Sequence, residues 1–322
     1  MKMRAAMLNG NGPLDNVRMG EIDAPTMGND QILVRVHAAA INPADLKVVS
    51  GTDGGAFLHA KNFPTAFGFD FSGVVEAVGG DVHDRSVGDQ VFGFLPYSRS
   101  TRQGSFAEFV AVKPDTVGVK PSNITHEEAA AAATAGSTAL QALEEKGRLR
   151  SGQKVLINGA SGGVGSYAVQ IASQLGAEVW GTASAAKAEF VKSRGAAHVI
   201  DYKTTALADI EEKFDVVLDA ASMSSFGEVR SILQPGGAYV TLLPSLGLFA
   251  GMLRGFLSGK RCGFVMVKSR AADLNRIADW LAGGKLEASV DATCPLDEVP
   301  AALAAQQAGK VQGKLAITIA TR

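Results

Sequence analysis

The first third of the chain alternates apolar and polar residues over short runs. Successive side chains of a strand point to opposite faces, so this alternation is typical of half-buried strands. The runs cover residues 31–37, 72–79, 89–94 and 106–112. Glycine, proline and aspartate separate them, as expected of tight turns. Short strands of this kind predict an irregular β-barrel over residues 1–121 rather than a parallel sheet.

The pattern changes near Pro121, where apolar strands begin to alternate with helices. Thr125, followed by two glutamates, is typical of a helix N-terminus, and an alanine-rich segment comes next. Six apolar runs follow, at residues 155–158, 178–182, 198–201, 214–219, 238–243 and 263–268. Buried strands that alternate with helices predict a doubly wound parallel sheet. The tail from Leu286 ends in another strand, at 314–319, and is expected to return to the first domain.

A glycine-rich turn joins the first of these six strands to the helix that follows it. Residues 158–165 fit the A-x-G-x-x-G variant of the dinucleotide-binding fingerprint. The middle glycine lets the backbone approach a pyrophosphate, the last lets helix and strand pack closely, and the helix N-terminus faces the phosphate charge. The loop residues expected to bind the cofactor are Ala160, Ser161, Gly162, Gly163, Val164 and Gly165.

The end of the second predicted strand indicates which dinucleotide is bound. NAD-specific sites place Asp or Glu there, where it binds the ribose 2′-hydroxyl. Residues 181–184 contain no acid; Ser184 supplies a hydroxyl there, and Lys187 follows. Lys187 is about as readily interpreted as a solvated helix residue. Because a hydroxyl and a cation suit a 2′-phosphate, we expect NADP(H).

Composition and charge argue against several other classes of protein. Of the 322 residues, 46% are hydrophobic and 20% are charged, as in a globular protein. A net charge of −1 favours neither nucleic acid nor an anionic membrane as partner. Cys262 and Cys294 have no metal-ligand spacing and fit a reducing compartment. With no secretory signal and no bilayer-spanning apolar run in the sequence, we expect a cytoplasmic protein.

Five motifs, in order, resemble those of the medium-chain dehydrogenase/reductase superfamily. They occur at residues 41–45, 64–73, 87–91, 104–108 and 161–165. The similarity is closest to its zinc-free quinone oxidoreductase branch, which residues 284–286 and 309–315 also resemble. The resemblance spans essentially the whole chain. It implies a GroES-like catalytic domain formed by residues 1–121 plus 269–322, around an inserted Rossmann NADP-binding domain at 122–268.

The resemblance also indicates what this chain lacks. Zinc-dependent relatives hold their catalytic metal through Cys, His and Cys, and the corresponding residues here are Asn42, Phe69 and Thr134. An amide, a phenyl ring and an alcohol are poor zinc ligands. Without a Lewis acid, hydride addition to an electron-poor acceptor is the easier chemistry. We therefore expect no metal, and hydride transfer from NADPH to quinones or α,β-unsaturated carbonyls.

The resemblance assigns further residues to the site. Asn42 and Thr138 correspond to contacts of nicotinamide or substrate, while Asp45 either orients the site or caps a turn. Tyr202 resembles a family tyrosine near the adenosine phosphate, although a surface role is also open. The segment whose backbone is expected beside the nicotinamide ribose is Leu242, Leu243 and Pro244.

Two alternative functions stay open at this point. One is an NADPH-binding sensor or structural protein without turnover, since such members occur in this branch. The other is an enoyl-thioester reductase, but those relatives carry a tyrosine that residues 50–57 lack. Tyr97 is a conceivable proton donor, though a packed loop residue is the commoner role. A homodimer is expected to form through the apolar loop 242–257 and the sixth strand, where related proteins pair their sheets.

Overall fold

A computed structural model describes residues 1–52, 54–244 and 246–319 of the chain. The chain divides into two compact units. The first comprises Met1–Thr134, Lys268–Gly284 and Ala288–Arg322, and the second comprises Ala135–Val267 and Lys285–Glu287. The second unit is thus inserted between segments of the first. The predicted limit after residue 121 lies before the alanine-rich helix, whereas the two units divide within that helix.

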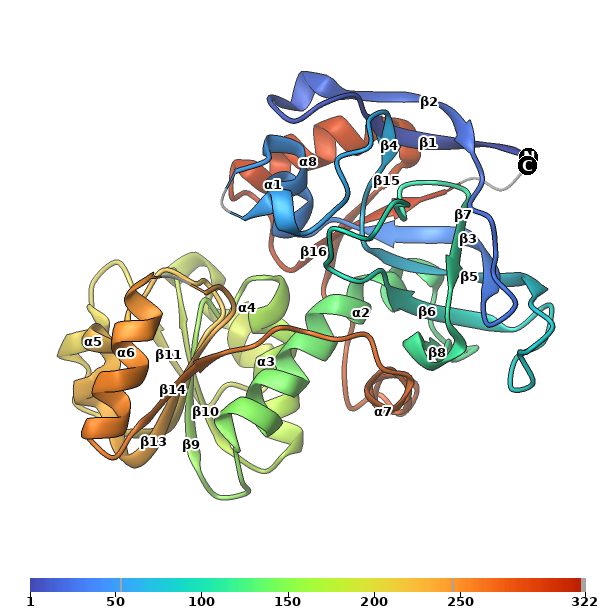
Figure 1. Cartoon of the computed structure of the whole chain (residues 1–322). Coiled ribbons are helices and arrows are strands. Elements are labelled where there is room, and N and C mark those ends of the chain that lie inside the picture. Colours follow the sequence, from blue (N-terminus) through green and yellow to red (C-terminus); the bar gives the residue numbers. More distant parts are fainter. Residues whose placement is uncertain (53, 245, 320–322) are drawn as a thin grey trace. The chain divides into compact units, whose positions relative to one another are not determined.

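The first unit is built from two β-sheets (Figure 1). Three strands pair in the order β2-β1-β4, and seven form a second sheet in the order β15-β16-β3-β5-β6-β8, with β7 on β3. Their bounds are β1 Lys2–Leu8, β2 Val17–Asp23, β3 Ile32–Ala40, β4 Thr65–Ala66, β5 Asp70–Val78, β6 Gln90–Phe94, β7 Phe109–Val112, β8 Val117–Val119, β15 Val290–Pro295 and β16 Lys314–Thr318. The predicted alternation is observed in β3, whose first seven residues alternate between buried and half-buried.

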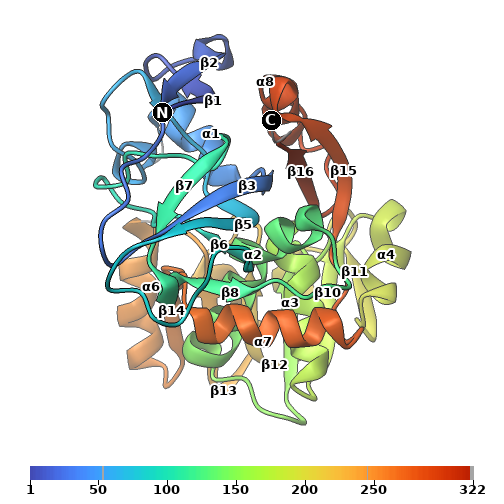
Figure 2. The same ribbon diagram turned by 90° about the vertical axis from the view of Figure 1, so that its right-hand side faces the viewer.

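The C-terminal segment completes the larger sheet, as the sequence predicts. β16 pairs antiparallel with β3, so that Ala316 lies opposite Ala40, and Figure 2 shows β15 and β16 side by side. Of the helices in the described residues, three lie wholly within this unit, α1 Pro43–Ser50, α7 Ala271–Ala282 and α8 Val299–Gln307. Because Ile41 N donates to Leu315 O, the start of β16 lies next to the start of α1. This pairing brings the first residue of β16, Lys314, into the interior of the unit, where it is 3% exposed.

The second unit is a six-stranded sheet in the order β11-β10-β9-β12-β13-β14, and all neighbours are parallel. The strands are β9 Lys154–Asn158, β10 Glu178–Ala183, β11 His198–Asp201, β12 Phe214–Asp219, β13 Leu233–Thr241 and β14 Arg261–Phe264. The helices α3 Gly163–Gln174 and α4 Ala188–Ser193 cover one face, and α5 Phe226–Val229 and α6 Leu246–Leu257 the other (Figure 1). This is the strand order of dinucleotide-binding sheets, and the predicted fold class is confirmed.

The alanine-rich helix is α2, His126–Gln141, and its start forms as predicted. Thr125 Oγ1 accepts a hydrogen bond from Glu128 N at 3.2 Å, and Thr125 N donates to Glu128 Oε2 at 2.7 Å. This reciprocal pair caps two N–H groups that the helix leaves without a partner. The alanines at 129–133 are fully buried, because their small side chains let neighbouring elements approach closely.

Part of the segment predicted as the apolar loop 242–257 is instead a helix, α6. Its apolar residues Phe249, Leu253 and Phe256 recur every three to four positions, which is the helical period. The prediction of a loop was wrong there. The predicted segment also includes Ser245, which lies outside the described residues. The sixth strand, β14, is shorter than predicted and ends at Phe264.

Candidate functional site

The glycine-rich loop joins the carboxyl end of β9 to the N-terminus of α3. Gly159 has a φ of 81°, a left-handed conformation that favours glycine. A Cβ on Gly165 would lie 2.1 Å from Gly159 O, so the helix can approach the loop only because that residue is glycine. A Cβ on Gly162 would meet only Gly159 O, at 3.4 Å, and would project into otherwise open space. The two glycines therefore have the geometry that the fingerprint requires.

The N-terminus of α3 has the properties of an anion-binding site. The first N–H groups of a helix have no partner within it, and no side chain caps this end. They carry the positive end of the helix dipole. With Gly162 leaving the space beside them open, these groups fit a pyrophosphate.

Polar side chains link this loop to the ends of neighbouring strands. Asn158 Nδ2 donates to Asp219 Oδ1 at 2.9 Å, and Thr182 Oγ1 donates to Asn158 Oδ1 at 2.6 Å. Thr182 Oγ1 also accepts from Gly159 N at 3.0 Å. The bonds tie β9, β10 and β12 together where the strand order reverses, the place at which such sheets bind ligands. Sequence reasoning missed this network, although a polar residue near each strand end was a usable signal.

The other predicted cofactor residues lie at carboxyl ends of the same sheet. Ser184 follows β10, Tyr202 follows β11, and the segment Leu242, Leu243 and Pro244 follows β13. Tyr202 is 57% exposed, so its geometry fits the surface role as well as a contact with a bound nucleotide. All of these positions share the edge of the sheet at which the glycine-rich loop lies.

Ser184 and Lys187 lie in one turn. Lys187 N donates to Ser184 O at 2.8 Å, and the Lys187 side chain is half-buried. Asp201, which sequence reasoning overlooked, accepts from Ala185 N at 3.2 Å and holds this turn against β11. Since Asp201 also accepts from Lys203 N at 2.9 Å, its two oxygens are both engaged by backbone groups.

In the first unit, two of the three positions that correspond to family zinc ligands bind the same carboxylate. Asn42 Nδ2 donates to Asp70 Oδ2 at 2.9 Å, and Thr134 donates to Asp70 Oδ1 through its backbone N, at 3.1 Å, and through Oγ1. Lys314 Nζ donates to Asp70 Oδ2 at 3.0 Å and to Asn42 Oδ1 at 2.6 Å. All four side chains are buried. Sequence reasoning singled out Asn42 and Thr134 but missed Asp70 and Lys314.

The third position, Phe69, is fully buried beside this cluster and packs on Tyr97, with 4.2 Å between ring centroids. Burial raises the pKa of the Tyr97 hydroxyl well above its ordinary value, and the Asp70 carboxylate adds to the shift. The Tyr97 ring therefore lies beside the cluster, in contact with Phe69.

The two remaining predicted catalytic residues differ in their surroundings. Asp45 lies in the first turn of α1, where its Oδ2 accepts from Asn42 N at 2.6 Å. This contact gives Asp45 the capping role, which is one of the two roles that the sequence left open for it. Thr138 is 6% exposed and follows Thr134 by one turn on α2. By contact it belongs to the second unit, whereas Asn42 and Asp45 belong to the first.

The donors around Asp70 do not fit a zinc ion. The carboxylate is already engaged by four hydrogen bonds, and Lys314 places a positive charge beside it. The neighbouring amide, alcohol and phenyl ring are not groups that zinc prefers. Among the described residues, no group of three or more His, Cys, Asp or Glu has a metal-binding arrangement.

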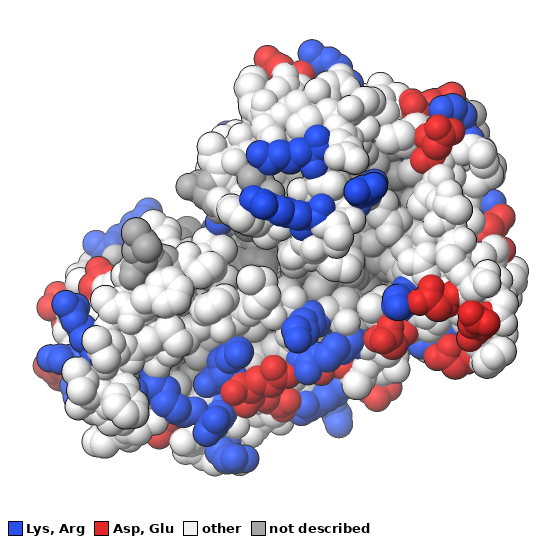
Figure 3. Space-filling view, in the orientation of Figure 1, with Lys and Arg blue, Asp and Glu red and all other residues white. Residues whose placement is uncertain are grey.

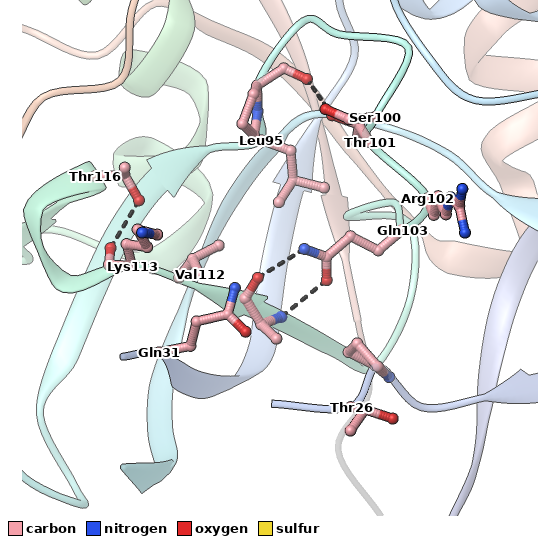
Figure 4. A pocket seen from close by; sticks show the side chains of 13 residues that line it. Thr26, Gln31, Leu95, Ser100, Thr101, Arg102, Gln103, Val112, Lys113 and Thr116 are labelled. Carbon is pink, nitrogen blue, oxygen red and sulfur yellow. Dashed lines mark hydrogen bonds between the residues drawn. The ribbon is translucent and has the colours of Figure 1, made fainter. Parts of the chain in front are cut away.

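A surface hollow of about 520 Å³ lies elsewhere in the first unit (Figure 4). Its walls include Leu95, Pro96 and Gln103, and Gln103 is held by two hydrogen bonds to the backbone of Ala111. None of the predicted site residues lines it. We therefore do not assign the hollow to the reaction.

Comparison with known proteins relates most of the chain to proteins named as oxidoreductases. Residues 28–122 match the family described as alcohol dehydrogenase GroES-like domain, and residues 194–317 match the family described as zinc-binding dehydrogenase. The bovine (Bos taurus) protein "NAD(P)H oxidoreductase RTN4IP1, mitochondrial" is 32% identical over 327 residues, which cover 90% of this chain and 82% of that protein. The tomato (Solanum lycopersicum) 2-methylene-furan-3-one reductase is 32% identical over 328 residues, covering 98% and 79%.

Among solved structures, a quinone oxidoreductase from Coxiella burnetii is similar to the chain with a TM-score of 0.91 and 28% identity, covering 99% of this chain and 100% of that one. Together with the glycine-rich loop, these similarities define a nicotinamide-dependent oxidoreductase built from a GroES-like and a Rossmann-like part. The chain belongs to the medium-chain dehydrogenase/reductase superfamily, in its quinone oxidoreductase-like branch. The predicted family is confirmed.

Proposed function

We propose that this protein transfers hydride from NADPH to quinones or α,β-unsaturated carbonyls without a metal ion. The observation that carries the proposal is the closed cluster around Asp70, in which Asn42 and Thr134 bind a carboxylate already paired with Lys314. Such a cluster has no free ligand set for a Lewis acid. The printed names of the quinone oxidoreductase and the 2-methylene-furan-3-one reductase support acceptors of this class.

In this proposal the chain's main work is to bind and orient the reactants. The bound dinucleotide supplies the hydride. The N–H groups at the start of α3 hold its pyrophosphate, and the network of Asn158, Thr182 and Asp219 keeps the loop in that geometry. A quinone or an enone is already electron-poor, so its carbonyl group needs less polarisation than that of a simple saturated ketone.

A panel of acceptors tests the reaction. We expect NADPH absorbance to fall with quinones and with enals or enones, and to stay constant with simple saturated ketones. Turnover of saturated ketones or of simple alcohols, with quinones and enones inert, would overturn the metal-free hydride proposal. Tight NADPH binding without turnover of any acceptor would favour a sensor or structural protein instead.

We also propose NADP(H) rather than NAD(H) as the cofactor. The support is the turn that contains Ser184 and Lys187. The end of β10 has no carboxylate to bind a ribose 2′-hydroxyl, and the Lys187 cation follows it in this turn. Lys187→Glu should weaken NADPH binding by tenfold or more and leave NADH binding nearly unchanged. Lys192→Glu, in the following helix, is the matched charge reversal and should change neither. Equal losses for both nucleotides in Lys187→Glu would contradict the preference.

A homodimer is proposed as the assembled form. The outer face of α6 carries the exposed apolar side chains of Phe249, Leu253, Phe256 and Leu257, which are 62% to 82% exposed. The opposite face carries Gly251, where an added Cβ would lie 2.9 Å from Phe226. Beside this helix, β14 is the edge strand of the sheet and offers unpaired backbone groups. A second copy of the same surface covers both features at once.

The remaining partners and the location are proposals as well. On the face drawn in Figure 3, basic and acidic side chains are interspersed, which does not favour a nucleic-acid partner. None of the helices in the described part of the chain has the length and apolar character needed to cross a membrane. We propose a cytoplasmic location from the cysteine content; cell fractionation with an antibody to the protein tests it.

A further inference from the structure

Lys314 is a buried cation with two polar partners among the described residues. Its ammonium lies 2.6 Å from Asn42 Oδ1 and 3.0 Å from Asp70 Oδ2, and the residue is 3% exposed. The partners come from segments that are distant in sequence, since 272 residues separate Lys314 from Asn42 and 244 separate it from Asp70. An ion pair of this kind at the protein surface would contribute little to the free energy of unfolding. Because both partners are buried here, the loss of one of them leaves an uncompensated charge and is costly.

We propose that Lys314 is the resident cation of this site and a positioning residue for the reaction. It neutralises Asp70 where metal-dependent relatives hold a dication, and together the pair fixes Asn42 and Thr134. The inference rests on the proposed function for its catalytic consequence. The charge pairing between Lys314 and Asp70 does not depend on which acceptor is reduced.

The charge balance requires both partners. Asp70 is fully buried and accepts four hydrogen bonds, but an isolated carboxylate in that setting carries a large desolvation cost. The Lys314 ammonium offsets it at a distance of 3.0 Å. Removing one partner of such a pair leaves an uncompensated charge, whereas removing both leaves none.

The pair also determines how its neighbours point. Asn42 Oδ1 accepts from Lys314 while Nδ2 donates to Asp70, so a flip of the amide would set like groups against each other. Thr134 is held to Asp70 through both its backbone N and its side chain. Thr138 lies one turn further along the same helix, α2.

Three variants test the positioning role. Lys314→Met should lower kcat for quinone reduction by about tenfold or more. The NADPH dissociation constant should change less than about twofold, because the glycine-rich loop belongs to the second unit. Lys314→Arg keeps the charge and should recover part of kcat. Lys310→Met, an exposed lysine nearby, is the control and should behave as wild type. An unchanged kcat in Lys314→Met would overturn the positioning role.

A double-mutant cycle tests the pairing without any turnover. Lys314→Met and Asp70→Asn should each lower the melting temperature by roughly 10 °C, as expected when a buried ion pair loses one partner. The double variant should melt above at least one of the single variants, since no charge is left unpaired. Losses that simply add would overturn the pairing. A wild-type protein that melts normally but reduces no acceptor would overturn the proposed function and leave the cycle's result standing.

Discussion

Asp45 shows how burial can determine the charge of a side chain. It is fully buried; Oδ2 accepts from Asn42 N, and Oδ1 has no hydrogen-bond partner among the described residues. Burial raises the pKa of Asp45 to about 8, against an ordinary value of 3.8, and the nearby Asp70 adds to the shift. At neutral pH the carboxyl is therefore largely protonated, which suits a cap better than a general base.

This raised pKa predicts how stability depends on pH. Between pH 4 and 8 the unfolded chain has released the Asp45 proton while the folded chain keeps it, so this group's contribution to stability falls as pH rises. Asp45→Asn removes the titration. The free energy of unfolding of Asp45→Asn relative to wild type should therefore increase from pH 5 to pH 8, by at most about 1.4 kcal/mol per pH unit. Urea unfolding at several pH values measures it.

The exposed Asp209→Asn serves as the control for this prediction. Asp209 lies on the surface, and the free energy of unfolding of Asp209→Asn should run parallel to that of wild type across the same pH range. Parallel curves for Asp45→Asn as well would contradict the raised pKa.

Some of the individual residues of the site could be predicted from the sequence. Asn42 and Thr134 were identifiable because the motifs around them resemble those that carry the family's zinc ligands, and an amide and an alcohol are poor replacements for such ligands. Asp70 and Lys314 were not identifiable, because their role depends on a contact between two positions that lie 244 apart in the sequence. A buried charge is recognisable only once its partner is known.

Among the elements, the loop between β9 and α3 separates two effects of glycine. In Gly162→Ala the new Cβ would meet only Gly159 O, at 3.4 Å, so the fold should persist while the space for a pyrophosphate is filled. We expect NADPH to bind at least about tenfold more weakly, a loss of about 1.4 kcal/mol, with a nearly unchanged melting temperature. Fluorescence titration and thermal melting measure the two effects.

Gly165→Ala should lower both NADPH affinity and melting temperature, because its Cβ would lie 2.1 Å from Gly159 O. Gly80→Ala is a neutral comparison, since a Cβ there meets nothing within 4 Å. If Gly162→Ala bound NADPH as wild type does, the pyrophosphate would not lie against this loop.

The elements that the sequence predicted well share a strong period. The runs in β3, β9, β10 and β12 were readable because strand alternation or continuous burial extends over most of their length. The helix α6 was misread because its exposed face is apolar, which removes the polar half of the helical pattern. The exposed apolar face is also the reason why α6 is a candidate dimer interface.

For the whole molecule, the proposed dimer follows from α6 and β14. Light scattering should give a mass near twice the 33.3 kDa of one chain. Phe256→Glu places a charge on the most exposed side chain of the α6 surface, at 82% exposure, and should shift the mass toward that of one chain. Val87→Glu, also on an exposed apolar residue but in the first unit, should leave the dimer intact. A wild-type monomer would contradict the assembly.

The measurement that tests the central proposal most directly follows the hydride itself. The enzyme is freed of metal with a chelator and given NADPH with both C4 hydrogens replaced by deuterium, together with an enone. We predict that the label appears on the β-carbon of the product, at a rate equal to that of the untreated enzyme. Loss of the rate on chelation with recovery on adding zinc, or a product without label, would contradict metal-free hydride transfer.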